Sequence, residues 1–317
     1  MADNGGQWER ELVTKLATAA LKEQRRARLW GIFFKLLTFA YITFILMLAV
    51  DWKGAADVTA GGKKHTAMVE VNGIIGPGSD ASAEKVTTAL QAAFKDKNTQ
   101  GVVIRINSPG GSPVQAQTIY DEMRRLRTKY PDIPLYAVVE DICASGGYFI
   151  AVGADRIYVS KSSLVGSIGV IMNGFGFTGL MDKLGVDRRL ITAGENKAFL
   201  DPFSPVEPKH VEFAKQLAAE IHQQFIGVVR EGRGKRLKET PDTFSGLIWS
   251  GQKSVELGLA DGIGSLDYVA REVVKAEEIV DFTQKENLAE KFAKRFGASA
   301  ATALAEFALR HSPELIR

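Results

Sequence analysis

Two residues, Ser145 and Lys197, carry the chemistry that this sequence suggests most directly. Ser145 lies in the stretch DICASGGY (141–148), between an expected strand over 135–139 and an expected helix over 146–153. Lys197 lies in the stretch AGENKAFLDPF, just past another expected strand. A serine held at a strand-to-helix turn, with a lysine as its base, is suited to acyl transfer.

The turn at Ser145 could also stabilise a developing anion. If Ser145 projects from the start of the helix, the partial positive charge there and the N–H of Gly146 face the same space. Ser145 could instead be an ordinary N-cap, whose oxygen accepts a hydrogen bond from its own helix. The turn alone does not decide between these two interpretations.

A second glycine turn, NSPGGSP (107–113), also follows an expected strand. Ser112 followed by a proline, with Gln115 three residues later, predicts an N-cap with a capping box. Gly110 and Gly111 can adopt backbone conformations closed to other residues, and their amides carry no covering Cβ. Such amides can donate to an oxyanion, although a tight loop before a capped helix needs the same residues.

The base is the harder question, because histidine occurs only at positions 65, 210, 222 and 311. A Ser-His-Asp triad through His210 or His222 stays open, without a supporting motif. A lysine can act as the base only when it is neutral, so its pKa must fall from about 10.4 toward about 7 or 8. Such a shift corresponds to roughly 4 kcal/mol, which burial can supply. The apolar residues that follow Lys197 in the sequence favour such a decrease in its pKa.

The composition is that of a globular protein with a sizeable core, since 45% of the 317 residues are hydrophobic and 24% are charged. The net charge is only +3 and the basic residues are dispersed, so nucleic acid is not an expected partner. The single cysteine, Cys143, excludes an intramolecular disulfide. We interpret it as a small buried residue.

An apolar run begins at Ile32 and ends at Val50, and as a helix it would span roughly 28 Å of hydrocarbon. Tryptophans flank it, and three arginines within 25–28 precede it. The positive-inside rule therefore places the N-terminus in the cytoplasm and the rest of the chain outside, at the inner membrane of a bacterium. A cleaved signal peptide is the competing interpretation, although its n-region would be about thirty residues long.

The chain divides into five expected parts. Residues 1–30 form a cytoplasmic segment, 31–51 a transmembrane helix, 52–65 a flexible Gly-rich tether, 66–275 the main domain and 276–317 a C-terminal helical extension.

Short β-type runs alternate with helical patterns in the main domain, which predicts an α/β domain with a mainly parallel sheet. The expected strands are 67–71, 102–106, 135–139, 157–159, 168–172 and 189–192, and the expected helices are 81–94, 113–130, 146–153 and 208–230. The last helix carries one broad apolar stripe, which we expect to face the core.

Five segments together resemble the signal peptide peptidase A (protease IV) family of Ser-Lys proteases. They are NSPGG, ASGGY, GSIGV, AGENKAFLDPF and SGQKSVELGLADGIG, in the family's order and spacing, over residues 66–268. The resemblance implies a Clp protease/crotonase-like fold, with Ser145 as nucleophile, Lys197 as general base and Ser167 orienting the lysine. It implies neither a metal nor an organic cofactor.

The resemblance further implies an oxyanion hole formed by Gly146 and the glycine pair, Gly111 more than Gly110. Only one ASGGY and one NSPGG occur, so the chain resembles the short form of the family rather than the form with two tandem domains. In the short form, oligomers assemble the active sites, and serine and lysine can come from neighbouring subunits. We therefore expect a homo-oligomer whose monomer is inactive.

The expected function is that of a membrane-anchored serine endopeptidase that cleaves short apolar peptides, such as signal peptides left in the membrane. Three alternatives stay open at this point. They are a regulatory protease acting on one membrane-protein partner, an inactive membrane scaffold, and a crotonase-like enzyme that holds a thioester enolate with paired backbone amides.

Overall fold

The computed structural model describes residues 5–49 and 62–284, which belong to two separate units. The described part of the first unit is one helix, α1 (Gly5–Ala49). Within it, the 33 residues Leu12–Phe44 are long and apolar enough to cross a membrane, although a signal sequence would meet the same criterion. Most of the expected tether lies outside the described residues.

The second unit is built on an eight-stranded sheet in the order β6-β5-β3-β2-β1-β8, with β4 beside β3 and β7 beside β4. Every pair of strands is parallel except β5 with β6. This confirms the predicted α/β domain with a mainly parallel sheet. The strands are β1 (His65–Asn72), β2 (Thr99–Ser108), β3 (Leu135–Ala144), β4 (Arg156–Val159), β5 (Leu164–Gly166), β6 (Ile248–Ser250), β7 (Gly262–Ile263) and β8 (Ile279–Asp281).

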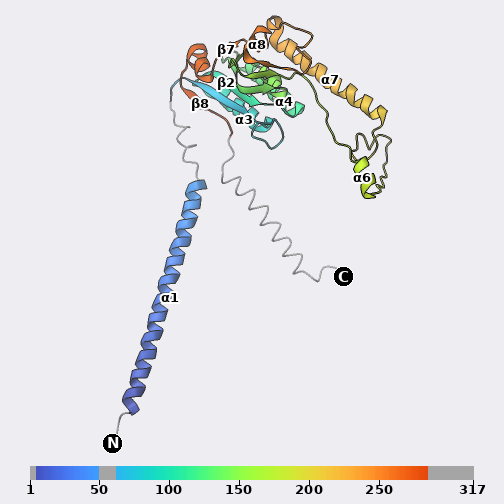
Figure 1. The fold of residues 1–317 in the computed structure, drawn as a ribbon. Coiled ribbons are helices and arrows are strands. Elements are labelled where there is room, and N and C mark those ends of the chain that lie inside the picture. The colour runs from blue at the N-terminus through green and yellow to red at the C-terminus, as the bar shows by residue number, and fades with distance from the viewer. Residues whose placement is uncertain (1–4, 50–61, 285–317) are drawn as a thin grey trace. The chain divides into compact units, whose positions relative to one another are not determined.

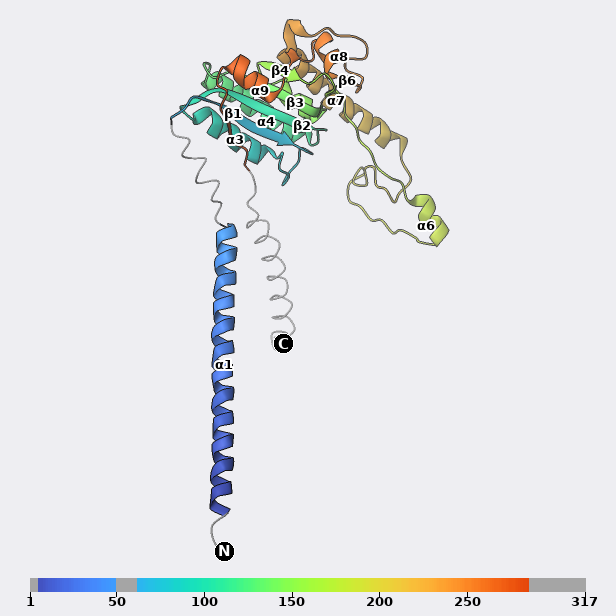
Figure 2. The same cartoon turned by 60° about the vertical axis from the view of Figure 1, so that its left-hand side comes forward.

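Helices connect and cover these strands (Figures 1 and 2). They are α3 (Ala83–Lys95), α4 (Pro113–Lys129), α5 (Gly146–Ala151), α6 (Thr178–Leu184), α7 (Pro208–Arg233), α8 (Gly251–Glu256) and α9 (Leu266–Tyr268), with short turns η1 (Gly234–Arg236) and η2 (Val269–Val274). Ser112 caps α4 by accepting from the Gln115 N–H, as predicted. The Gln115 side chain, however, accepts from Ala83 N–H at 2.8 Å and so joins α4 to α3 instead of completing a capping box.

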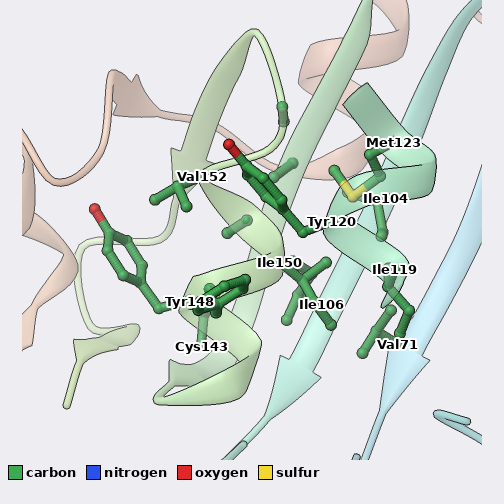
Figure 3. Close-up of a cluster of buried hydrophobic side chains, with 14 of the residues drawn as sticks. Val71, Ile104, Ile106, Ile119, Tyr120, Met123, Cys143, Tyr148, Ile150 and Val152 are labelled. Carbon is green, nitrogen blue, oxygen red and sulfur yellow. The ribbon is translucent and has the colours of Figure 1, made fainter. Parts of the chain in front are cut away.

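The core lies between the sheet and the helices that pack on it. Ile104 and Ile106 of β2, Ile119 and Met123 of α4, and Cys143 at the end of β3 are all fully buried, and Figure 3 shows their side chains together. Burial on this scale holds the carboxyl ends of β2 and β3, and therefore the two glycine turns, at fixed positions. The buried position of Cys143 agrees with its interpretation from the sequence.

Two predicted strands, 168–172 and 189–192, are wrong. The structure has instead β5, slightly earlier in the chain, which pairs with both β3 and β6. Residues 169–207, which we call the arm, leave the sheet and carry α6 to the far end of α7 (Figures 1 and 2). Ile171 and Ile191 are 82% and 95% exposed, so these apolar runs have no partner strand among the residues that the structure describes.

Helix α7 also differs from the prediction that its whole apolar stripe faces the core. Phe225, Ile226 and Val229, in its C-terminal half, are buried. Phe213, nearer its start, is 56% exposed. The reason is that only the last turns of α7 reach the body of the domain, whereas its first turns extend toward the arm (Figure 1).

The domain is slightly longer at both ends than the sequence suggests. His65, expected in the tether, is the first residue of β1, is 3% exposed and lies 3.3 Å from the Thr99 hydroxyl. Strand β8 lies in the expected C-terminal extension and pairs with β1. The remainder of that extension, from residue 285, lies outside the described residues.

Candidate active site

Ser145 lies at the turn from β3 into α5 in a strained backbone conformation, with φ 52° and ψ −122°. A positive φ is uncommon for a residue with a side chain and is retained where the surrounding structure imposes it. Here the Ser145 N–H donates to the Gly166 carbonyl at 2.8 Å, and its own carbonyl accepts from Phe149 N–H. Its hydroxyl does not cap α5 and has no hydrogen-bond partner among the described residues, which disfavours the N-cap interpretation.

The glycine turn at 110–111 is held in place by Ile75, in the loop after β1. The Ile75 N–H donates to the Gly110 carbonyl at 2.9 Å, and the Ile75 carbonyl accepts from Ser112 N–H at 2.8 Å. Gly111 has φ +150°, and a Cβ on it would lie 2.0 Å from the Ile75 oxygen. Only glycine fits this position without moving the backbone.

The two glycines of this turn have different roles. The Gly110 N–H already donates to the Ser108 hydroxyl at 3.1 Å, so it is not free for a substrate. The Gly111 N–H has no acceptor among the described residues, and its nitrogen lies 3.3 Å from where a Cβ of Gly146 would be. Gly111 and Gly146 are therefore the pair of backbone donors that the geometry offers beside Ser145.

Gly110 matters instead because the two turns approach each other closely. A Cβ at this position would lie 2.7 Å from the Ser145 Cβ and 2.8 Å from the Gly146 nitrogen. A glycine here allows the β2 turn to pack directly on the β3 turn.

Ser167 lies beside Ser145 because β3 and β5 run parallel in register. Ala144 pairs with Gly166, and each serine is the residue directly after the end of its strand. Ser167 also has a positive φ of 52°, and its N–H donates to the Leu247 carbonyl at 2.7 Å. It is half-buried, near enough in register to orient a group that approaches Ser145.

A cavity of about 490 Å³ opens beside Ser145 and is lined largely by apolar groups. Its walls include Val114 and Phe149, together with Ile221 and Phe225 of α7. Its size and lining suit an apolar side chain of a bound peptide. A larger, more polar cavity of about 750 Å³ includes neither Ser145 nor Lys197 in its lining.

Lys197 is exposed on the arm, which differs from the apolar burial that we expected from its neighbours in the sequence. No hydrogen bond joins it to Ser145 or Ser167 in the described part of the chain. Both views in Figures 1 and 2 show the α6 end of the arm well away from the sheet. Among the described residues of a single chain, no contact joins the lysine to the serine.

The two histidines of α7 indicate how far the loop of Lys197 lies from the turn of Ser145, because each contacts one of these two regions. The His222 ring donates from Nε2–H to the Ile168 carbonyl, one residue past Ser167, at 3.0 Å. The His210 ring lies 3.3 Å from the Asn196 side-chain oxygen, one residue before Lys197. A separation of twelve positions along a helix corresponds to about 18 Å.

Neither of these histidine rings hydrogen bonds to Ser145 in the described structure, which leaves the alternative triad without support. Within residues 5–49 and 62–284, no group of three or more His, Cys, Asp or Glu side chains is placed to hold a metal ion. Ile75 was not identified from the sequence, and Gly166 was named only as part of the segment GSIGV without a role, because both residues act through backbone atoms.

Comparison with known proteins identifies the relatives of this chain. The family model Peptidase family S49 matches residues 127–280, and the model Clp protease matches residues 67–164. A putative protease of Synechocystis is 32% identical over 203 residues, which cover 64% of this chain and 71% of that protein. The chain belongs to peptidase family S49. The resemblance and the Clp-like fold expected from the sequence are thereby confirmed.

Two further relatives of this S49 peptidase differ in how much of their length it covers. A putative signal peptide peptidase SppA of Enterococcus faecium is 29% identical over 228 residues, 69% of this chain and 66% of that protein. The Na(+)/H(+) antiporter NhaA of Brucella abortus is 48% identical over 177 residues, 56% of this chain. Because the match covers only 24% of that antiporter, its named activity is not carried over.

Proposed function

We propose that this S49 peptidase is a serine endopeptidase in which Ser145 is the nucleophile and Lys197 of a neighbouring copy is the general base. The observation that carries the proposal is the strained, unpartnered Ser145 beside the free Gly111 N–H, at the mouth of an apolar cavity. The site has a nucleophile, an oxyanion donor pair and a place for the substrate. Within one chain it lacks only the base.

The proposed reaction uses each of these groups in turn. A neutral Lys197 takes the proton of the Ser145 hydroxyl as its oxygen attacks the scissile carbonyl. The N–H groups of Gly111 and Gly146 hold the oxyanion of the tetrahedral intermediate, and Lys197 then protonates the leaving amine. Water releases the acyl-enzyme by the same steps. Ser167 would accept a hydrogen bond from the lysine and so orient it.

The exposed apolar side chains of the arm support an active site that is shared between two copies of the chain. It exposes Ile171, Phe175 and Ile191, each more than 80% accessible in the single chain. Contact with a second copy would remove these side chains from water, and the same contact would bring a lysine on the arm into apolar surroundings. The functional unit would be a homo-oligomer.

The substrates that this cavity favours are short apolar peptides, such as signal peptides left in the membrane. Its walls are Val114, Phe149, Ile221 and Phe225, with no charged side chain lining it. A similar protein from Enterococcus faecium carries the name putative signal peptide peptidase. Comparison of the membrane peptides that accumulate with wild type and with Ser145→Ala would identify the substrates, and accumulation of one intact membrane protein alone would favour a regulatory protease.

We also propose that α1 anchors the protein in a bacterial inner membrane, with residues 1–30 in the cytoplasm and the sheet domain in the periplasm. The apolar window of α1 and the arginines before it support this arrangement. The full chain should remain with membranes after alkaline extraction, and added protease should digest the sheet domain only after the outer membrane is opened. Release as a shortened soluble chain would indicate a signal peptide.

Active-site labelling tests the proposed function. Ser145→Ala and Lys197→Ala should each lose peptide cleavage while the protein stays folded, and a serine-directed acylating reagent should label wild type only at Ser145. The labelling also separates a peptidase from a crotonase-like enzyme, which has no need of a nucleophilic serine. Near-normal turnover by either variant would rule out the proposed mechanism.

A further inference from the structure

The loop that carries Lys197 is attached to the first turns of α7 by contacts on both sides of the lysine. On one side, the Asn196 side-chain oxygen lies 3.3 Å from Nε2 of His210. On the other side, the Phe199 ring packs edge-on against the His210 ring, with centroids 5.4 Å apart. One imidazole thus contacts the residue before Lys197 and the residue two positions after it.

His210 is unusual in its burial. It is 6% exposed, and it is the only buried residue between positions 171 and 224. A polar ring is buried at little cost only when its nitrogens have partners, and here Nε2–H donates to Asn196. The arm from residue 171 onward is exposed or half-buried, so the contact with His210 is its only buried attachment among the described residues.

The other contacts between the arm and α7 are peripheral. Lys209 forms an ion pair with Glu195 at 2.9 Å, but the two side chains are 49% and 80% exposed. Exposed pairs of this kind contribute little to positioning or stability. Phe213 adds an edge-on contact with Phe199 but is itself 56% exposed. His210 is therefore the buried residue among the contacts that attach the loop to α7.

We propose that His210 is a positioning residue for Lys197, and that α7 presents the lysine as part of a rigid unit to the serine of a neighbouring copy. The inference rests on the proposed function. A lysine side chain has four rotatable bonds, so a mobile loop would add to its freedom at the moment when it must reach a hydroxyl. A displacement of about 1 Å in a catalytic group can lower turnover by about 100-fold.

The first test is kinetic. His210→Ala should lower kcat by about 10- to 100-fold with little change in KM, because His210 does not line the cavity beside Ser145. His210→Gln, whose amide nitrogen can still donate to Asn196, should recover part of that loss. Gln216→Ala, an exposed position on the same helix, is the matched control and should keep wild-type turnover. Turnover of His210→Ala within about twofold of wild type would overturn the inference.

The second test distinguishes positioning from a general structural role. In oligomers formed by co-expression of Ser145→Ala and Lys197→Ala chains, the Ser145→Ala chain supplies the base. His210→Ala should abolish most of the recovered activity when it is placed in that chain, and should have little effect in the Lys197→Ala chain. Equal loss in both placements would show that His210 only supports folding and would overturn the inference.

The two tests also separate this inference from the proposed function. If Lys197→Ala alone keeps normal activity, the assignment of the base fails, and the positioning role fails with it. If Lys197 is required but His210→Ala has no effect on kcat, only the positioning role fails. If no mixture of chains recovers activity in oligomers that contain both, the presentation of Lys197 to a neighbouring copy fails, and the kcat of His210→Ala with its recovery by glutamine then tests only whether His210 positions the lysine.

Discussion

Replacement of Gly111 by alanine would test the oxyanion hole directly. The new Cβ would lie 2.0 Å from the Ile75 oxygen and 2.9 Å from the Ile75 carbon and nitrogen, at a backbone φ of +150°. The main chain must move to relieve this contact, and the Gly111 N–H moves with it. Loss of one oxyanion donor costs about 2.7 to 4 kcal/mol in the transition state, which corresponds to about 10²- to 10³-fold in kcat.

The assay is peptide cleavage by the oligomer, with active sites counted by serine acylation so that kcat refers to folded enzyme. KM should change less than kcat, because Gly111 is only one of the residues that line the cavity beside Ser145 and the other wall residues are unchanged. Gly258→Ala is the control, since its Cβ would lie 1.8 Å from the Arg236 oxygen at φ +72°, and Gly258 does not line the cavity beside Ser145. It should lower stability but not kcat per folded molecule. A folded Gly111→Ala enzyme with kcat within about threefold of wild type would refute the role of this amide.

Two further predictions concern the body of the domain. Burial alone would raise the pKa of the Asp261 carboxyl, but hydrogen bonds from Arg233 and Ile157 and the charge of Arg233 outweigh it and hold the pKa below its usual range. Asp261→Asn leaves the buried Arg233 charge without its carboxylate partner and should lower the free energy of unfolding by about 3 to 5 kcal/mol at neutral pH. A carboxyl group whose pKa is lowered by folding stabilises the fold only above the pKa it has in the unfolded chain, so the stability difference between wild type and variant should shrink below about pH 4 in urea titrations. Equal stability of the two proteins at pH 7 would contradict this prediction. Burial also raises the pKa of the Cys143 thiol, so alkylating reagents should modify it only after unfolding, and rapid labelling of native protein would show that it is accessible.

Strands β1 to β4 could be predicted because they are largely buried, whereas the short strands β5 to β8 were not predicted. β1, β2 and β3 are rich in valine and other apolar residues, and such stretches indicate strands wherever a partner strand is present. The same pattern misled at 168–172 and 189–192, since an apolar run does not reveal whether a partner exists. Among the described residues neither run has one, and every residue of the two runs except the buried Ile168 stays exposed or half-buried.

The candidate site was predictable to a similar extent. The turns at Ser145 and Gly111 could be predicted, because glycines at the ends of expected strands are recognisable from residue type alone. The backbone hydrogen bonds of Ile75 and Gly166 could not be predicted, because every residue type carries the same backbone carbonyl group. The surroundings of Lys197 could not be predicted either, since in the proposed mechanism they belong to another copy of the chain.

Mixing two inactive chains tests the central proposal, that the serine and the lysine meet between copies, most directly. Ser145→Ala and Lys197→Ala should each be inactive alone. In oligomers assembled from equal amounts of both, about a quarter of the sites should pair an intact serine with an intact lysine from the neighbouring copy, and activity should recover to about that fraction of wild type. Activity no higher than that of either variant alone, in oligomers shown to contain both chains, would contradict the account.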